Sequence, residues 1–285
     1  MGHGPPPALK QIEFGLIRSA PHLDNHRVLF HRYVALGDSQ TEGMNDLDAH
    51  GGIRGWADRF AVYLAERNPD LLYANLAIRG RRTRRIRADQ LEPALGLNPD
   101  LASVMAGAND VLGSFDLEET MTDLEDMYAA LRGIGATVIG CTFPDPGASF
   151  SIARRLTPRV RALNAAIRDA AARHGVVLVD FEAYPAVNDP RWWTHDRLHL
   201  NTAGHTRLAV AFADVLGVRP DPSWQESLPP LSPRAWWRSS VEDAEWLARF
   251  WVPWFVRHVR GRSTGDNRLP KRPALEPVAQ IVDPS

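Results

Sequence analysis

Short apolar runs alternate with amphipathic segments between residues 33 and 217. The apolar runs predict strands at 33–36, 71–77, 101–105, 137–142 and 176–181. Patterns with the helical period follow each strand, at 56–67, 83–95, 117–132, 157–174 and 202–216. Such alternation is typical of an α/β fold around a parallel sheet. The run at 176–181 is almost continuously apolar, which predicts a strand buried on both faces.

The two ends of the chain lack this pattern. Residues 1–32 are predicted to form an N-terminal arm, and residues 33–218 form the α/β domain. Residues 219–285 form a C-terminal extension that holds six of the nine tryptophans, with a helical pattern at about 241–259. We expect the extension to pack on the α/β domain, because large exposed apolar patches are rare on monomers. The alternative is a contact between its Trp-rich helix and a membrane surface, a lipid substrate or a second subunit.

Composition narrows the class of protein. The chain has 285 residues, 44% of them hydrophobic, which is enough for a large core. A net charge of −1 argues against nucleic-acid binding through overall charge. The single cysteine, Cys141, excludes an internal disulfide and a cysteine-based zinc cluster. Neither an export signal nor a membrane-spanning apolar run is visible in the sequence, so we expect a cytoplasmic protein.

Residues with catalytic potential follow the predicted strands. Ser39 comes after the first strand, Gly80 after the second, Asn109 after the third, and Asp196 and His199 after the fifth. Ligands bind at the carboxyl ends of parallel strands, so these residues are expected at one edge of the sheet. Their chemistry fits acyl transfer, with Ser39 as nucleophile, His199 as its base and Asp196 orienting the imidazole. The backbone N–H groups of Ser39 and Gly80 and the amide of Asn109 would form an oxyanion hole.

Four blocks of sequence carry a family resemblance. Gly37-Asp38-Ser39, Gly80, Gly107-x-Asn109-Asp110 and Asp196-x-x-His199 resemble the blocks of the SGNH (GDSL) hydrolases, the GDSL-like lipases and acylhydrolases, in order and spacing. Gln40 stands where the family's nickname has leucine. The resemblance covers about residues 33–217.

The resemblance implies a three-layer α/β/α fold with a flavodoxin-like parallel sheet of about five strands. It also implies the Ser39–His199–Asp196 triad, the oxyanion donors Ser39, Gly80 and Asn109, and hydrolysis without metal or organic cofactor. We therefore expect a serine esterase that forms an acyl-enzyme on Ser39. Its substrate is expected to be a small-molecule, lipid or sugar ester.

Other interpretations stay open at this point. His195, Asp196 and His199, with His205 beyond them, resemble the spacing of a zinc-protease helix and would make a metal-dependent hydrolase. An acyltransferase could use the same triad, and a non-catalytic module could keep the fold to bind a ligand. Residues 261–265 match the Gly-x-Ser-x-Gly elbow, but no strand precedes Ser263 and no histidine follows it, so we reject this motif.

A run of arginines follows the second predicted strand, from Arg79 to Arg87. The plainer interpretation is a solvated helix face. The functional interpretation is that Arg79 or Arg81, beside Gly80, contacts a phosphate or carboxylate of the substrate.

Overall fold

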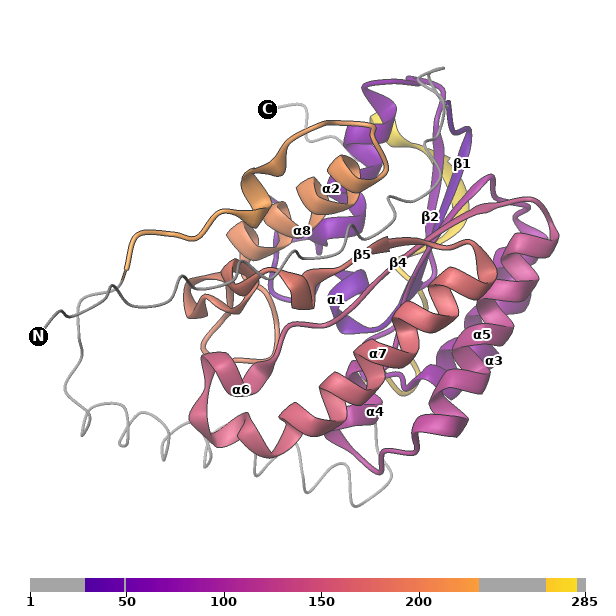
Figure 1. Ribbon diagram of the computed structural model, residues 1–285. Helices are drawn as coiled ribbons and strands as arrows, with labels where there is room; N and C mark the ends of the chain where they lie inside the picture. Colours follow the sequence, from indigo (N-terminus) through magenta and orange to yellow (C-terminus); the bar gives the residue numbers. More distant parts are fainter. Residues whose placement is uncertain (1–28, 49, 231–264, 281–285) are drawn as a thin grey trace, which may run out of the picture.

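A computed structural model describes residues 29–48, 50–230 and 265–280, which form one sheet with helices on both faces (Figure 1). The sheet has six strands in the order β5-β4-β3-β1-β2-β6. Strands β1 to β5 are parallel, and β6 is antiparallel to β2. The strands are β1 (Arg32–Gly37), β2 (Leu72–Asn75), β3 (Leu101–Met105), β4 (Thr137–Cys141), β5 (Val177–Val179) and β6 (Arg272–Pro277).

The helices form the two outer layers. On one face α2 (Gly55–Ala65) packs against α8 (Thr202–Val215), and on the other α3 (Thr83–Gly96), α5 (Leu117–Gly133) and α7 (Thr157–His174) lie side by side. Short helices α1 (Ser39–Glu42), α4 (Ala108–Leu112) and α6 (Pro146–Ser149) follow β1, β3 and β4. The remaining turns are the 3-10 helices η1 (Ser151–Leu156), η2 (Phe181–Ala183), η3 (Pro185–Asn188), η4 (Pro190–Trp192), η5 (Pro222–Gln225) and η7 (Val278–Gln280).

The predicted α/β fold is confirmed. All five predicted strands occur, and their order, β2-β1-β3-β4-β5, is that of flavodoxin-like sheets. In this order the chain reverses direction across the sheet between β1 and β3, which is where ligands bind in such folds. The segments after β1 and β3 therefore begin at the expected place for a site.

The prediction for the fifth strand is wrong in two respects. β5 is shorter than predicted, and at the edge of the sheet, where it pairs with β4, it is not fully buried on both faces as predicted. Val177 and Leu178 are only half-buried. The apolar run continues because Phe181 leaves the sheet and packs into the core from η2.

The sequence does not predict strand β6. Its segment carries Pro273 and Pro277, and proline normally argues against a strand. An edge strand tolerates proline, because one row of its backbone groups faces away from the ladder. Val278, directly after β6, is fully buried and donates its backbone N–H to the carbonyl of Leu71 at 3.2 Å.

The packed unit continues beyond residue 218. Trp224 is buried, and its indole Nε1 donates to the Asp214 carboxylate at 2.8 Å. The Trp-rich helix predicted at 241–259, Ser263 and most of the N-terminal arm lie outside the described residues. Within the described ranges, none of the helices combines the length and apolar character needed to cross a membrane.

Glycine fixes the contact between α1 and α2. A Cβ on Gly55 would lie 2.2 Å from the Cα of Gly43, and Gly55 also has a left-handed φ of +80°. No other residue combines this approach with this backbone conformation at low cost. The end of α1 is thereby set directly against the start of α2.

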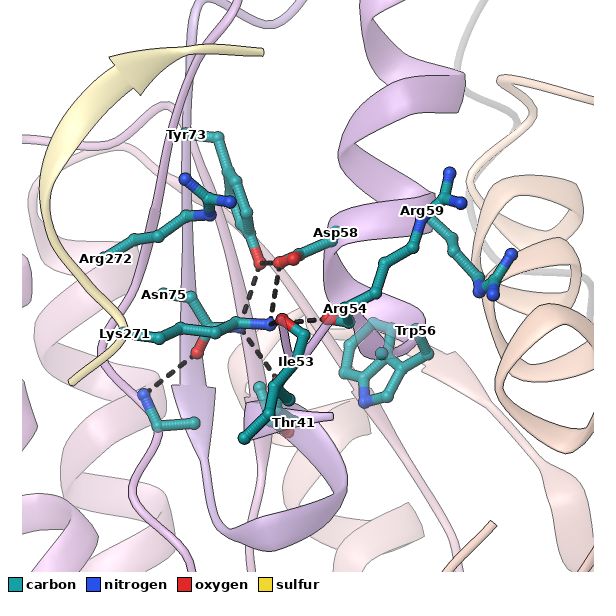
Figure 2. A network of polar contacts seen from close by, with 12 residues as sticks. Thr41, Ile53, Arg54, Trp56, Asp58, Arg59, Tyr73, Asn75, Lys271 and Arg272 are labelled. Carbon is teal, nitrogen blue, oxygen red and sulfur yellow. Dashed lines mark hydrogen bonds and ion pairs between the residues drawn. The ribbon is translucent and has the colours of Figure 1, made fainter. Parts of the chain in front are cut away.

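A buried polar network joins β6 to the same region. Figure 2 shows the Lys271 ammonium 2.9 Å from the Asp58 carboxylate, which also accepts a hydrogen bond from the Tyr73 hydroxyl at 2.8 Å. Asn75 donates to the Tyr73 hydroxyl at 2.9 Å and to the carbonyl of Thr41 in α1 at 2.8 Å. The C-terminal segment is therefore connected, through β2, to the helix that begins at Ser39.

This network makes Lys271 the counter-ion of a buried carboxylate. Burial lowers the pKa of Lys271, and the charge of Asp58 acts against that shift. Removing one member of a buried ion pair leaves the other charge uncompensated, which typically costs about 3–5 kcal/mol.

We predict that Lys271→Met lowers the free energy of unfolding by about 3–5 kcal/mol, measured by urea denaturation. Glu276→Gln, which removes an exposed partner of Arg272 on the same strand, is the matched control and should cost less than about 1 kcal/mol. Adding Asp58→Asn to Lys271→Met should recover part of the loss. Equal stabilities of Lys271→Met and the control would contradict the proposed importance of this pair.

Candidate active site

Ser39 lies at a sharp turn between β1 and α1. Asp38 caps the short helix, its carboxylate accepting the backbone N–H of Gln40 at 3.1 Å. A Cβ on Gly37 would lie 2.3 Å from the Thr41 hydroxyl and 2.9 Å from the carbonyl of Met105. The glycine therefore lets α1 fold back tightly against β3, and the turn places Ser39 at the carboxyl edge of the sheet.

Three side chains form a hydrogen-bonded chain at this edge. The Ser39 Oγ lies 3.0 Å from His199 Nε2, although the two residues are 160 positions apart. His199 Nδ1 lies 2.8 Å from Asp196 Oδ2. The structure thus brings together the three residues that the sequence predicts as a triad.

Asp196 is held as an anion by its own loop. Its Oδ1 accepts the backbone N–H groups of Leu198 and His199, both at 2.9 Å, and the Thr194 hydroxyl at 2.7 Å. Asn45 donates to Oδ2 at 3.2 Å. Burial alone would raise the pKa of Asp196, but the hydrogen bonds and charge of His199, with those of the loop, outweigh burial and hold the pKa well below its usual range.

Gln40 connects the nucleophile helix to the loop that carries His199. Its amide Nε2 donates to the carbonyl of Leu198 at 2.8 Å, and its Oε1 accepts the N–H of Leu200 at 3.4 Å. These two backbone groups stand on either side of His199. The residue that departs from the family's leucine therefore holds the histidine loop from both sides.

The predicted oxyanion donors have defined surroundings. Asn109 lies in α4, the short helix that follows β3. Its Nδ2 donates to Asp38 Oδ2 at 2.8 Å and to the carbonyl of Arg81 at 3.0 Å. An oxyanion role for Asn109 therefore requires one of these bonds to be exchanged for the substrate oxygen. Gly80 has a left-handed φ of +72°, a conformation that favours glycine.

Asp38 is a buried carboxyl beside the triad. Burial raises its pKa to about 6, although the N–H of Gln40, the charge of His199 and the amide of Asn109 act in the opposite direction. The carboxylate thus fixes both the nucleophile turn and the Asn109 amide while lying in surroundings that disfavour its charge.

The arginines beside Gly80 have partners within the fold. Arg79 Nη2 lies 2.7 Å from Glu42 Oε1, and its backbone N–H donates to Glu42 Oε2 at 2.7 Å. Arg81 lies 3.4 Å from both Asp89 and Asp266. Neither guanidinium is the solvated group expected from a helix face, since both side chains are largely buried and paired. Their contact with an anionic substrate stays a prediction.

His205 belongs to the core rather than to a metal site. Its Nδ1 accepts the N–H of Trp56 at 3.2 Å, and its Nε2 lies 3.1 Å from the carbonyl of Met44. Burial lowers its pKa to about 4. In the part of the chain that the structure describes, no group of three or more His, Cys, Asp or Glu side chains is placed to hold a metal ion. The metal-dependent alternative thus lacks the third histidine that the sequence offered.

Several residues at the site escaped sequence reasoning. Gln40, Glu42, Asn45 and Thr194 bind backbone or side chains of the site through contacts between distant segments. Gln40 and Glu42 lie next to Ser39 in the sequence, and this proximity was the one indication that they belong to the site. No spacing rule would have revealed their partners.

The overall structure resembles several solved hydrolases. LAE5, an alpha/beta hydrolase enzyme from the metagenome of Lake Arreo, Spain, is 27% identical with a TM-score of 0.56, over 66% of this chain and 95% of LAE5. TesA is 22% identical with a TM-score of 0.55, over 65% of this chain and 98% of TesA. A variant of Axe2, an acetyl xylan esterase from Geobacillus stearothermophilus, is 22% identical with a TM-score of 0.55, over 66% of this chain and 95% of Axe2.

Sequence comparison identifies the family more directly. None of the curated proteins matches this chain. The family profile of the GDSL-like Lipase/Acylhydrolases matches residues 35–207, which include all four blocks and more than half of the chain. The protein therefore belongs to the GDSL-like Lipase/Acylhydrolase family.

Proposed function

We propose that this protein is a serine esterase that cleaves carboxylic ester bonds through an acyl-enzyme on Ser39 and needs no cofactor. One observation carries the proposal: the continuous hydrogen-bonded chain from Ser39 Oγ through His199 to Asp196, with links of 3.0 and 2.8 Å. A serine hydroxyl becomes a nucleophile when an oriented base accepts its proton.

The tautomer of His199 follows from its two partners. Ionised Asp196 accepts a hydrogen bond from the Nδ1–H group, which leaves the lone pair of Nε2 facing the Ser39 hydroxyl. In the first half of the reaction, Ser39 Oγ attacks the ester carbonyl carbon while Nε2 takes the hydroxyl proton. The negative charge of Asp196 stabilises the imidazolium that forms.

The tetrahedral intermediate then collapses. Nε2 returns its proton to the leaving alcohol, the bond between carbonyl carbon and alcohol oxygen breaks, and the acyl group remains on Ser39. Water attacks the acyl-enzyme in the second half, giving its proton to Nε2, and the acid leaves as Ser39 recovers its proton. During both halves the backbone N–H groups of Ser39 and Gly80 and the Asn109 amide would stabilise the oxyanion.

A fluorophosphonate probe tests this proposal. We expect a mass adduct on the wild type and none on Ser39→Ala, whose ester hydrolysis should fall by about 10³-fold or more. Ser223→Ala, on the exposed turn η5, should label and turn over like the wild type.

Two outcomes would contradict the serine mechanism. One is a well-folded wild type that hydrolyses esters without forming the adduct. The other is hydrolysis that survives Ser39→Ala and disappears on treatment with a metal chelator.

The contacts of Gln40 assign it a positioning role. Gln40→Leu keeps much of the side-chain volume but removes both bonds to the His199 loop. We predict about a tenfold lower kcat with a nearly unchanged KM, because lost hydrogen bonds of this kind are worth about 1–2 kcal/mol. Gln225→Leu makes the same change on η5 and should leave kcat unaltered.

Gln40→Glu separates positioning from packing. Glutamate keeps the length and an acceptor for the N–H of Leu200, but it has no donor for the carbonyl of Leu198. This variant should therefore also lose kcat. Wild-type kcat in both Gln40 variants would refute the role.

The raised pKa of Asp38 predicts a pH dependence of stability. Well below pH 3.8, the ordinary pKa of an aspartate, Asp38 is protonated in both folded and unfolded chains and carries no penalty. As pH rises from the ordinary value of 3.8 to about 6, the unfolded chain ionises more readily, so the fold loses stability. The full penalty, up to about 3 kcal/mol, is present above the folded pKa.

Asp38→Asn removes this titration. We predict that the stability of the variant relative to wild type increases between pH 4 and pH 6–7 and then stays constant. Urea denaturation of both proteins across pH 4–8 measures the difference, in which other titrating groups cancel. A difference that does not change with pH would contradict the assignment.

A further inference from the structure

An apolar cavity of about 160 Å³ lies against the proposed active site. Its walls come mainly from α4, α7, α8 and the segments 143–150 and 181–200. Three of its lining residues adjoin the proposed catalytic groups along the chain: Gln40 follows the nucleophile, Ala108 precedes Asn109, and Leu198 precedes the catalytic histidine. The cavity is therefore bounded by the same segments that carry the proposed catalytic groups.

The cavity walls are almost entirely hydrocarbon. Val160 and Leu163 of α7, Leu208 of α8, Val111 of α4 and Phe181 of η2 all contribute. Each of these side chains is buried, and four belong to regular helices, so the walls are part of the packed fold. A cavity with such walls binds apolar groups and offers little to water.

The carboxylate and amide side chains at the cavity are committed elsewhere, whereas the buried indole Nε1 of Trp193, which also lines the cavity, has no hydrogen-bond partner in the described part of the chain. The Asp145 carboxylate accepts the Thr157 hydroxyl at 2.7 Å and the N–H of Gly147 at 2.8 Å. The Gln40 amide is bound to the backbone of the histidine loop. These groups are engaged by the protein and do not call for a polar ligand.

The two arginines at the cavity stack on aromatic rings. The Arg197 guanidinium lies 5.0 Å from the centre of the Phe150 ring, and that of Arg207 lies 4.5 Å from the Trp192 ring. Arg207 also donates to the carbonyl of Trp224 at 2.7 Å. Their aliphatic stems and the rings extend the apolar wall, as long cationic side chains commonly do.

We propose that this cavity binds the hydrocarbon chain of the substrate's acyl group, and that it selects chains of about six carbons. The proposal rests on the proposed esterase function and adds its substrate class. The size follows from volume, since an apolar cavity of about 150 Å³ accommodates a six-carbon ring such as benzene. Hydroxyl-rich acyl or sugar groups would lose their hydrogen bonds with water here and gain few in return.

The reaction sequence favours the acyl group over the alcohol as occupant. The alcohol leaves from the side of His199 and must depart before water can attack. The acyl group stays attached to Ser39 through both halves of the reaction. A chain held in the cavity would therefore orient the carbonyl carbon in the acylation and the deacylation steps alike.

The test is a series of p-nitrophenyl esters from acetate to dodecanoate. For the wild type, kcat/KM should rise by up to about fourfold per added methylene and stop rising at about six carbons. Val160→Phe, which fills the cavity from α7, should lower kcat/KM for the hexanoate at least about tenfold while leaving the acetate within about twofold. Val210→Phe, a half-buried valine of α8 that does not line the cavity, is the matched control and should keep the wild-type profile.

A second series separates the acyl group from the alcohol. Acetate esters of methanol through hexanol carry the chain on the alcohol, and Val160→Phe should leave their relative rates unchanged. A length dependence confined to the alcohol series would overturn the acyl assignment. If Val160→Phe fails to fold, Val187→Phe fills the same cavity from its half-buried wall.

Failure of this proposal is distinct from failure of the esterase function. A flat length profile that Val160→Phe does not alter, together with a fluorophosphonate adduct on Ser39, would overturn the cavity assignment and keep the serine mechanism. Absence of both adduct and turnover would overturn the function on which the assignment rests.

Discussion

The position of His199 is the constraint on which the proposed site depends. Its imidazole has to lie within hydrogen-bond distance of a serine 160 positions away, on a loop without regular structure of its own. The loop achieves this by folding around the Asp196 carboxylate, which gathers two of its backbone N–H groups. Arg197, between Asp196 and the two residues that donate these N–H groups, adopts a left-handed φ of 57°. Gln40 of α1 then holds the loop by a hydrogen bond to the carbonyl of Leu198.

The elements around α1 are packed closely against it. Glycines at positions 37 and 55 let β3 and α2 approach α1 more closely than any side chain would allow. On the β2 side, Asn75 holds the carbonyl of Thr41 and connects it to the Tyr73–Asp58–Lys271 network (Figure 2). The segment that leads into β6 thus helps to hold α1 in place, as β1 does. Rigid positioning of this kind is what catalytic hydrogen bonds of fixed length require.

The sequence predicted those parts of the fold that local patterns encode. Apolar runs located the five parallel strands. Ser39 and Asn109 follow two of them closely, and Asp196 and His199 follow the fifth across a loop. Strand β6 could not be predicted, because its prolines and lack of alternation make sense only at a sheet edge. The edge position of β5 was hidden for a related reason, since an apolar run does not reveal how many neighbours a strand has.

Contacts between distant segments set the limit for the site as well. The arginines beside Gly80 looked solvated because a sequence pattern does not show that Glu42, Asp89 and Asp266 lie opposite them. The role of Gln40 was equally invisible, because its partners are carbonyl and amide groups of the backbone, which have no sequence signature. Backbone partners of this sort can be identified only in the folded chain. The proposed nucleophile, base and carboxylate can be recognised in the sequence because their residue types are characteristic.

The most direct measurement of the central claim is rapid chemical quench of the enzyme with an activated ester, followed by mass spectrometry of its peptides. The account predicts a transient mass increase equal to the acyl group, located on the peptide that contains Ser39. It also predicts that the acylated species forms and decays at rates consistent with turnover. Steady hydrolysis of the ester with no acylated peptide at any time, in an assay able to detect one, would contradict it.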